Sequence, residues 1–140
     1  MKFMVESFEI LEHQADVRIF AKGSDYEKLF RAALQGLCEV ILHEPQKDKQ
    51  HSVVKQIIVE SHDITSLLID FLSEVLSLSH QDKVLFCEVN FEKLTDSFLN
   101  AEIKGYKVDG FDEDVKAVTY HEAEVSFSEG VYSTVIVLDI

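Results

Sequence analysis

The stretch ITSLLIDFLSEVLSL, residues 64–78, decides how this chain can fold. Its apolar residues recur at helical spacing and form one strongly apolar stripe. Asp63 stands directly before them and is a favourable N-cap. Because an amphipathic helix must bury its stripe against other elements, we expect this helix to form the centre of the core. The stripe consists of Ile64, Leu67, Leu68, Phe71, Leu72, Val75, Leu76 and Leu78.

A second helix is predicted upstream of this stretch. The apolar residues between Leu29 and Ile41 recur at helical spacing and give a broad apolar face. The residues from Ser24 to Glu27 fit a capping box, so we expect Ser24 to be the N-cap. Pro45 sets the end of this helix, because the residue before a proline disfavours the helical conformation.

The rest of the chain alternates apolar and polar residues, which predicts strands. Successive strands near the C-terminal end can pair as antiparallel hairpins. We therefore expect an α+β fold, with one mixed or mostly antiparallel sheet of about seven strands packed with two amphipathic helices. Residues 1–140 are long enough for a single domain. The expected strands are Val5–Glu12, Asp16–Ala21, Val53–Glu60, Val84–Phe91, Ser97–Gly105, Val115 to about Phe127, and Tyr132–Leu138.

The composition excludes several classes of function. The formal net charge is −13, so most of the surface would repel a phosphate backbone, and direct nucleic-acid binding is not expected as the main activity. An acidic surface suits a basic protein partner or hard cations, although solubility alone would also account for it. No apolar run is long enough to span a bilayer, and Met1 to Glu6 lacks the apolar region of a signal peptide. We therefore expect a cytoplasmic protein that does not associate with membranes.

The two cysteines carry no motif. Cys38 and Cys87 lie far apart among apolar residues, without the Cys-x-x-Cys spacing of zinc or redox sites. We interpret them as two buried small hydrophobic residues. The acidic segment from Asp109 to Asp114 does not match the ligand pattern of an EF-hand, and we interpret it as a solvated turn.

Two aspartates stand next to predicted buried strands. Asp16 opens the second strand, and Asp139 follows the apolar run of residues 135–138. A carboxylate near buried surface is costly unless it is paired or binds a metal. If Asp16, Asp139 and the terminal carboxylate of Ile140 meet, they form an oxygen-only cluster, which selects calcium or magnesium rather than zinc. The alternative is that both aspartates face water at the ends of their strands.

Four motifs, in this order, resemble those of the archease family. They are His13-Gln14-Ala15-Asp16, the helix from Leu67 to Leu76, the hexapeptide Lys116-Ala117-Val118-Thr119-Tyr120-His121, and the final pair Asp139-Ile140. Their order covers nearly the whole chain. Gln14 stands where the family usually has threonine, and Phe71 stands where it usually has tryptophan. The fold tolerates such swaps of volume.

The resemblance implies a protein cofactor rather than a free-standing enzyme. Archeases assist the GTP-dependent RNA ligase of tRNA splicing and RNA repair by promoting guanylylation of the ligase's histidine and repeated turnover. RNA would then be met only indirectly, through the ligase. The family binds calcium or another divalent cation, with Mg²⁺ or Mn²⁺ as alternatives. Carried onto this chain, the resemblance implies Asp16, Asp139 and Ile140 as cation ligands, and His13, Lys116 and His121 as supporting or partner-contact residues.

Two other functions stay open at this point. The first is a metal-dependent hydrolase that uses Asp16, Asp139 and His121 to activate water. The second is a chaperone-like interaction module whose acidic surface keeps its partners soluble.

Overall fold

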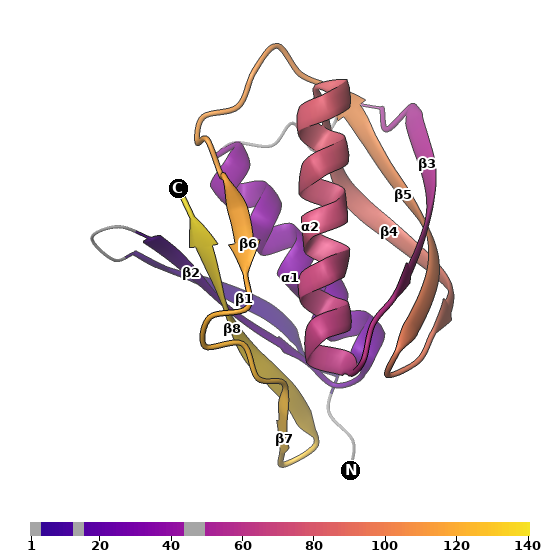
Figure 1. Ribbon diagram of the computed structural model, residues 1–140, viewed down its shortest axis with the longest axis vertical. Coiled ribbons are helices and arrows are strands. Elements are labelled where there is room, and N and C mark those ends of the chain that lie inside the picture. Colours follow the sequence, from indigo (N-terminus) through magenta and orange to yellow (C-terminus); the bar gives the residue numbers. More distant parts are fainter. Residues whose placement is uncertain (1–3, 13–15, 44–49) are drawn as a thin grey trace.

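Two helices lie between two antiparallel sheets in the computed structural model of the protein, which describes residues 4–12, 16–43 and 50–140 (Figure 1). Both helices contact strands of both sheets. In chain order the elements are β1 (Glu6–Glu12), β2 (Asp16–Gly23), α1 (Tyr26–Ile41), β3 (Val53–Glu60), α2 (Ile64–Asp82), β4 (Val84–Leu94), β5 (Phe98–Lys107), β6 (Ala117–Thr119), β7 (Ser126–Ser128) and β8 (Val131–Asp139).

The first sheet joins strands from the first and the last parts of the sequence. Its strand order is β1-β2-β8-β6, and β7 also pairs with β8. In this register Asp139 of β8 lies opposite Asp16 of β2 on one side and opposite Ala117 of β6 on the other. The second sheet has the order β3-β5-β4, and β4 is irregular between Phe86 and Glu88.

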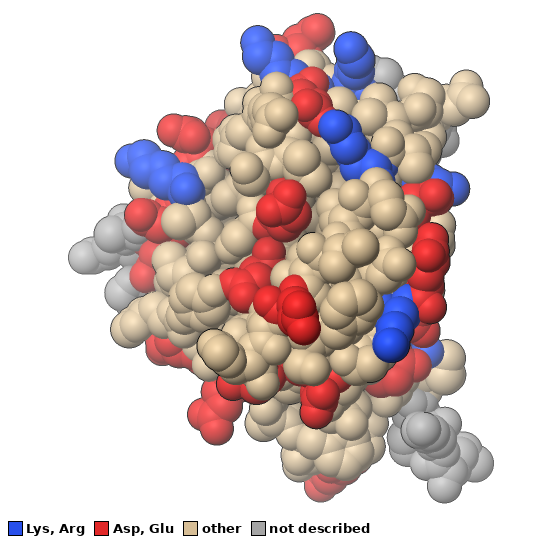
Figure 2. Space-filling view, turned by 45° about the vertical axis from the view of Figure 1, so that its right-hand side comes forward, with Lys and Arg blue, Asp and Glu red and all other residues tan. Residues whose placement is uncertain are grey.

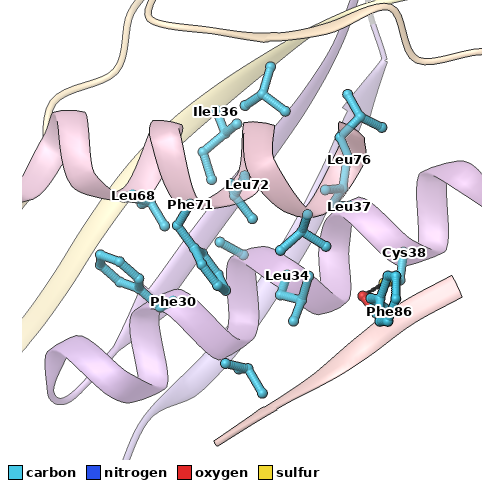
Figure 3. Close-up of a cluster of buried hydrophobic side chains, with 14 of the residues drawn as sticks. Phe30, Leu34, Leu37, Cys38, Leu68, Phe71, Leu72, Leu76, Phe86 and Ile136 are labelled. Atoms are coloured by element: carbon cyan, nitrogen blue, oxygen red, sulfur yellow. Dashed lines mark hydrogen bonds between the residues drawn. The ribbon is translucent and has the colours of Figure 1, made fainter. Parts of the chain in front are cut away.

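The helix over residues 64–78 lies at the centre of the core, as its apolar stripe predicts. Phe71 of α2 is fully buried and packs against Phe30 of α1 and Phe91 of β4, with ring centroids 5.7 and 5.8 Å apart. Figure 3 shows α1 and α2 side by side, with Phe86 and Ile136 reaching the same cluster from the two sheets. Within the residues that the structure describes, no helix is both long and apolar enough to cross a membrane.

The α+β class with two helices is confirmed, but the strands do not form one sheet. The described residues contain eight strands, which are divided between the two sheets. The physical reason lies in α1, which buries residues around most of its circumference rather than along one face. A helix that is apolar on most sides needs cover on both sides. It contacts β1 and β2 in one sheet and β4 in the other.

The long strand expected from Val115 to about Phe127 is wrong. Two short segments of this range pair separately with β8, namely Ala117–Thr119 as β6 and the residues from Ser126 onward as β7. Between them lies a turn in which the backbone N–H of Ala123 donates to the carbonyl of Tyr120 at 3.1 Å. The hydroxyl of Tyr120 donates to Asp70 on α2, which draws the chain towards the helix. Glu122 then adopts a φ of +61°, in the left-handed region that no strand contains.

The expected N-cap of α1 is also wrong by one residue. Asp25 is the N-cap, and its Oδ1 accepts a hydrogen bond of 2.8 Å from the backbone N–H of Lys28. Ser24 is buried instead, and its backbone N–H donates to the carbonyl of Val5 at 2.8 Å. The cap of α2 is confirmed, because Asp63 accepts from the backbone N–H of Ser66 at 2.7 Å.

Candidate metal centre

Asp16 and Asp139 lie opposite each other on neighbouring antiparallel strands. Directly opposite residues of an antiparallel pair project their side chains from the same face of the sheet. The two carboxylates are therefore neighbours, although they stand near opposite ends of the chain. Like charges placed directly opposite each other destabilise a sheet unless a positive charge compensates them.

Asp16 has unused capacity to accept hydrogen bonds. Its side chain is 24% exposed, yet its Oδ1 is buried and accepts no hydrogen bond from the described residues. The guanidinium of Arg18 approaches this oxygen to 3.6 Å, which is an ion-pair contact but too long for a hydrogen bond. A buried carboxylate oxygen without a donor is costly, which is the condition that a bound cation would relieve.

Arg18 is committed mainly to another acid. Its Nη2 and Nε contact the same oxygen, Oε2 of Glu122, at 2.7 and 2.9 Å. The hydrogen bond to Glu122 and, more weakly, the charge of Asp16 raise the pKa of Arg18 against the opposing effect of desolvation. Sequence reasoning missed both residues. Arg18 could have been found, because it stands two residues after Asp16 and so shares its face of the strand.

Lys116 reaches this end of the sheet with its backbone. Its backbone N–H donates to the carbonyl of Asp139 at 2.7 Å. Its side chain lines a separate pocket of about 380 Å³ between α2 and β6, together with Ser77 and His80. Among the described residues, no hydrogen bond or ion pair joins the Lys116 side chain to either aspartate.

His121 lies exposed in the turn after β6, next to Glu122. No described hydrogen bond or ion pair joins it to Asp16 or Asp139. His13 lies outside the described residues.

A cleft of about 440 Å³ opens beside Asp16, at the end of α1. The acidic segment interpreted as a solvated turn is an irregular loop whose residues Asp109, Asp112 and Asp114 are exposed, as expected, while Glu113 lines part of the cleft. The backbone N–H groups of Asp112 and Glu113 donate to the carbonyl of Ile41 at 2.8 and 3.3 Å, and Asp112 Oδ2 accepts from the backbone N–H of His43 at 2.9 Å. The two bonds to Ile41 satisfy a carbonyl group that the C-terminal end of a helix leaves without a partner. The cleft is lined by Ile10, Asp16, Val17, Glu39, Val40, His43, Glu113 and Ile140.

The residues present fit a hard cation in part. Two carboxylates share one face, and a buried oxygen of Asp16 lacks a donor. Within residues 4–12, 16–43 and 50–140, however, no group of three or more His, Cys, Asp or Glu side chains is arranged to hold a metal ion. A cation at Asp16 and Asp139 would therefore need main-chain oxygens, such as those of Ile140, or water to complete its coordination. Calcium accepts such mixed oxygen sets.

Acidic side chains form patches near the middle and along one side of the face shown in Figure 2. The basic side chains on this face are scattered, and several lie near its upper edge. This face therefore offers no continuous basic surface of the kind that a nucleic-acid backbone requires.

The chain matches one protein family over nearly all of its length. The family model described as "Archease protein family (MTH1598/TM1083)" matches residues 8–140. Two curated relatives named "Protein archease" are those of Methanosarcina barkeri and Pyrococcus abyssi. The first is 29% identical, with 96% of this chain and 97% of the relative covered. The second is 32% identical, with 97% of this chain and 100% of the relative covered.

Solved structures have the same fold. Protein 1598 of Methanobacterium thermoautotrophicum superimposes with a TM-score of 0.79 at 26% identity, covering 97% of this chain and 100% of that one. A protein of Thermotoga maritima described as "an archease, possible chaperone" superimposes with a TM-score of 0.65 at 18% identity, covering 94% and 96%. The family match across residues 8–140 and the relative of 32% identity together show that the chain belongs to the archease family.

Proposed function

We propose that the protein is an activator of a GTP-dependent RNA ligase in tRNA splicing or RNA repair, acting in the cytoplasm without being an enzyme itself. In this proposal it promotes guanylylation of the ligase's histidine and allows multiple turnover. The protein meets RNA only through the ligase. The membership of the chain in the archease family and its acidic surface both support this function.

The observation that carries the proposal is the pairing of Asp16 with Asp139 across β2 and β8. A protein that served only as a soluble interaction module would gain nothing from two carboxylates placed opposite each other, since this arrangement is destabilising. The buried, donor-free Oδ1 of Asp16 adds a second cost. Such costs are typical of a site that is kept for binding.

Each residue of the site has a distinct part in the proposed mechanism. Asp16, Asp139 and the main-chain oxygens of Ile140 would hold calcium or another divalent cation, Mg²⁺ or Mn²⁺. Such a cation, when bound, supplies positive charge that stabilises phosphate oxygens during nucleotidyl transfer. The hydrogen bond from the Lys116 backbone to the Asp139 carbonyl fixes the end of β8. Lys116 and His121 are exposed and could contact the ligase, and His13 would be a further contact.

Single-turnover guanylylation of the cognate ligase tests the proposal. We expect the ligase with GTP and divalent cation to form the guanylylated enzyme faster when this protein is present. Equal rates with and without the protein would overturn the proposal. Turnover of GTP or a phosphoester by the isolated protein would instead favour a metal-dependent hydrolase.

A chaperone-like role is the second candidate, because the Thermotoga maritima relative is described as a possible chaperone. It predicts that the protein suppresses heat-induced aggregation of unrelated proteins. In that case Asp16→Asn would suppress aggregation as well as the unchanged protein does, because the site would be irrelevant to that activity.

A further inference from the structure

Arg18 places a positive charge beside the proposed cation site. Asp16, Arg18 and Asp139 share one face at the end of the first sheet, since Arg18 stands two residues along β2 from Asp16. A guanidinium at this position is a fixed positive charge, because arginine does not lose its proton in proteins. It therefore neutralises the paired carboxylates and, for the same reason, opposes the entry of a metal cation.

Arg18 contacts two carboxylates at unequal distances. Two of its nitrogens contact Oε2 of Glu122 at 2.7 and 2.9 Å, whereas its contact with Asp16 Oδ1 is 3.6 Å. Glu122 thus holds the guanidinium short of a hydrogen bond to Asp16. The Oδ1 of Asp16 stays buried and without a donor as a result.

The backbone at Glu122 fits this role. Glu122 lies in the turn after β6 with a φ of +61°, a conformation that residues other than glycine rarely adopt. The turn brings Glu122 of that segment to Arg18 of β2, although β8 separates β2 from β6 in the sheet.

We propose that Arg18 is a built-in competitor of the divalent cation at Asp16 and Asp139, and that Glu122 sets the cation affinity by holding Arg18 away from Asp16. This inference rests on the proposed function, because it concerns the same site. With Glu122 in place, Asp16 is left open to a cation. Without Glu122, Arg18 closes on Asp16 and takes the place of the cation.

Calcium titration by isothermal calorimetry tests the inference in three variants. Arg18→Gln removes the competing charge, so we expect Ca²⁺ affinity to rise about three- to tenfold at low salt, with a smaller rise at high salt where charges are screened. Glu122→Gln releases Arg18 onto Asp16, so the affinity should fall by about the same factor. In the double variant the Glu122→Gln change should have little effect, because its partner is gone.

Arg31→Gln is the matched control. Arg31 contacts Glu6 at 3.5 Å, and Glu6 pairs with Gly23 at the opposite end of the β1–β2 ribbon from Asp16. The control removes the same charge without touching the site, so its Ca²⁺ affinity should match that of the unchanged protein. Circular dichroism melting of each variant confirms that it is folded.

The outcomes separate this inference from the proposed function. Unchanged or weaker Ca²⁺ binding in Arg18→Gln, or an equal effect of Glu122→Gln with and without Arg18, would overturn the role of Arg18 alone. Binding seen only in Arg18→Gln would support it. If no variant bound Ca²⁺, both the cation site and the inference would fail. If the affinities shifted as expected but the ligase were not stimulated, the proposed function would fail and the role of Arg18 would stand.

Discussion

Gly105 shows how closely β5 and β4 approach at the irregular part of the second sheet. A Cβ atom at this position would lie 2.2 Å from the carbonyl oxygen of Leu85 and 2.9 Å from the Cα of Phe86, both of which are backbone atoms. Backbone cannot move aside as a side chain can. We therefore predict that Gly105→Ala lowers the free energy of unfolding by about 2 kcal/mol or more.

Urea denaturation monitored by circular dichroism measures this loss. Gly110→Ala is the control, because a Cβ atom at Gly110 meets nothing within 4 Å. Its free energy of unfolding should stay within about 0.5 kcal/mol of that of the unchanged protein. Equal stabilities of the two variants would contradict the close approach at Gly105.

The two thiols differ in their chemistry. Cys38 is buried, and its thiol donates to the carbonyl of Phe86 at 3.3 Å. Burial raises the pKa of Cys38 well above its ordinary value, whereas the polar interaction with the neighbouring Cys38 thiol lowers the pKa of Cys87, which is half-buried. The interpretation of both as buried small hydrophobic residues is confirmed for Cys38, whereas Cys87 packs against the core but is only partly buried.

Because the thiolate is the reactive form, we predict that iodoacetamide alkylates Cys87 of the native protein before Cys38. The rate at Cys87 should rise with pH through a midpoint below that of an ordinary thiol, since its pKa is lowered. Peptide mass spectrometry follows both sites. Cys38→Ala removes the interaction that lowers the pKa of Cys87 and should move the midpoint upward. Faster labelling of Cys38 than of Cys87 would contradict this picture.

At the residue scale, the sequence predicts the unusual aspartates but not their partners. Asp16 and Asp139 stand out because each carries a charge beside a run of buried strand residues. The Arg18–Glu122 contact cannot be predicted in the same way. It depends on a turn at Glu122, where the sequence has no glycine that would predict a turn. It also depends on a contact between residues far apart in the sequence.

Asp25 determines where α1 begins. Burial raises the pKa of Asp25, but the hydrogen bonds from Lys28 outweigh it, and the net shift is downward. A lowered pKa means that the folded state holds the charged carboxylate more strongly than the unfolded chain does. The stabilisation is therefore present above the unfolded pKa and is lost as the pH falls through the folded pKa.

We predict that Asp25→Ala lowers the free energy of unfolding by about 1 kcal/mol at pH 7, the usual value of an N-cap. The difference from the unchanged protein should shrink as the pH falls through the lowered pKa of Asp25 in the folded state, because the carboxylate is then protonated. Urea denaturation over a series of pH values from 7 downward measures it. Gln35→Ala, at an exposed position of the same helix, is the control and should leave stability nearly unchanged. A cost for Asp25→Ala that does not depend on pH would contradict the role of the charged cap.

At the element scale, the helices are the best-predicted part of the fold. Their apolar spacing extends over many residues, and α2 begins at the cap that Asp63 predicts. The hexapeptide at residues 116–121 is less well predicted, because alternation over a few residues does not distinguish a strand from a strand end. The strand ends before Tyr120, whose hydroxyl donates a hydrogen bond to Asp70 on α2, an element distant in the sequence.

At the scale of the whole molecule, the class of fold follows from the sequence but the division into two sheets does not. Strand patterns show which residues alternate, and they do not show which strand lies beside which. The pairing of β2 with β8 joins segments from opposite ends of the chain, and this pairing creates the candidate site. Four short motifs in order resembled the archease family, and the match over residues 8–140 confirms that resemblance.

In the proposed function, the paired carboxylates at one end of the first sheet give this acidic protein its effect on a ligase. Guanylylation of the cognate ligase in a single turnover, measured against Ca²⁺ concentration with Asp16→Asn and Asp139→Asn, tests this role of the carboxylates. Glu9→Gln, at an exposed position in the middle of β1, is the control for loss of one negative charge. We predict that the control stimulates the ligase like the unchanged protein, while both aspartate variants remain folded and lose most of the stimulation. Full stimulation by folded Asp16→Asn and Asp139→Asn would contradict the proposed role of the two carboxylates.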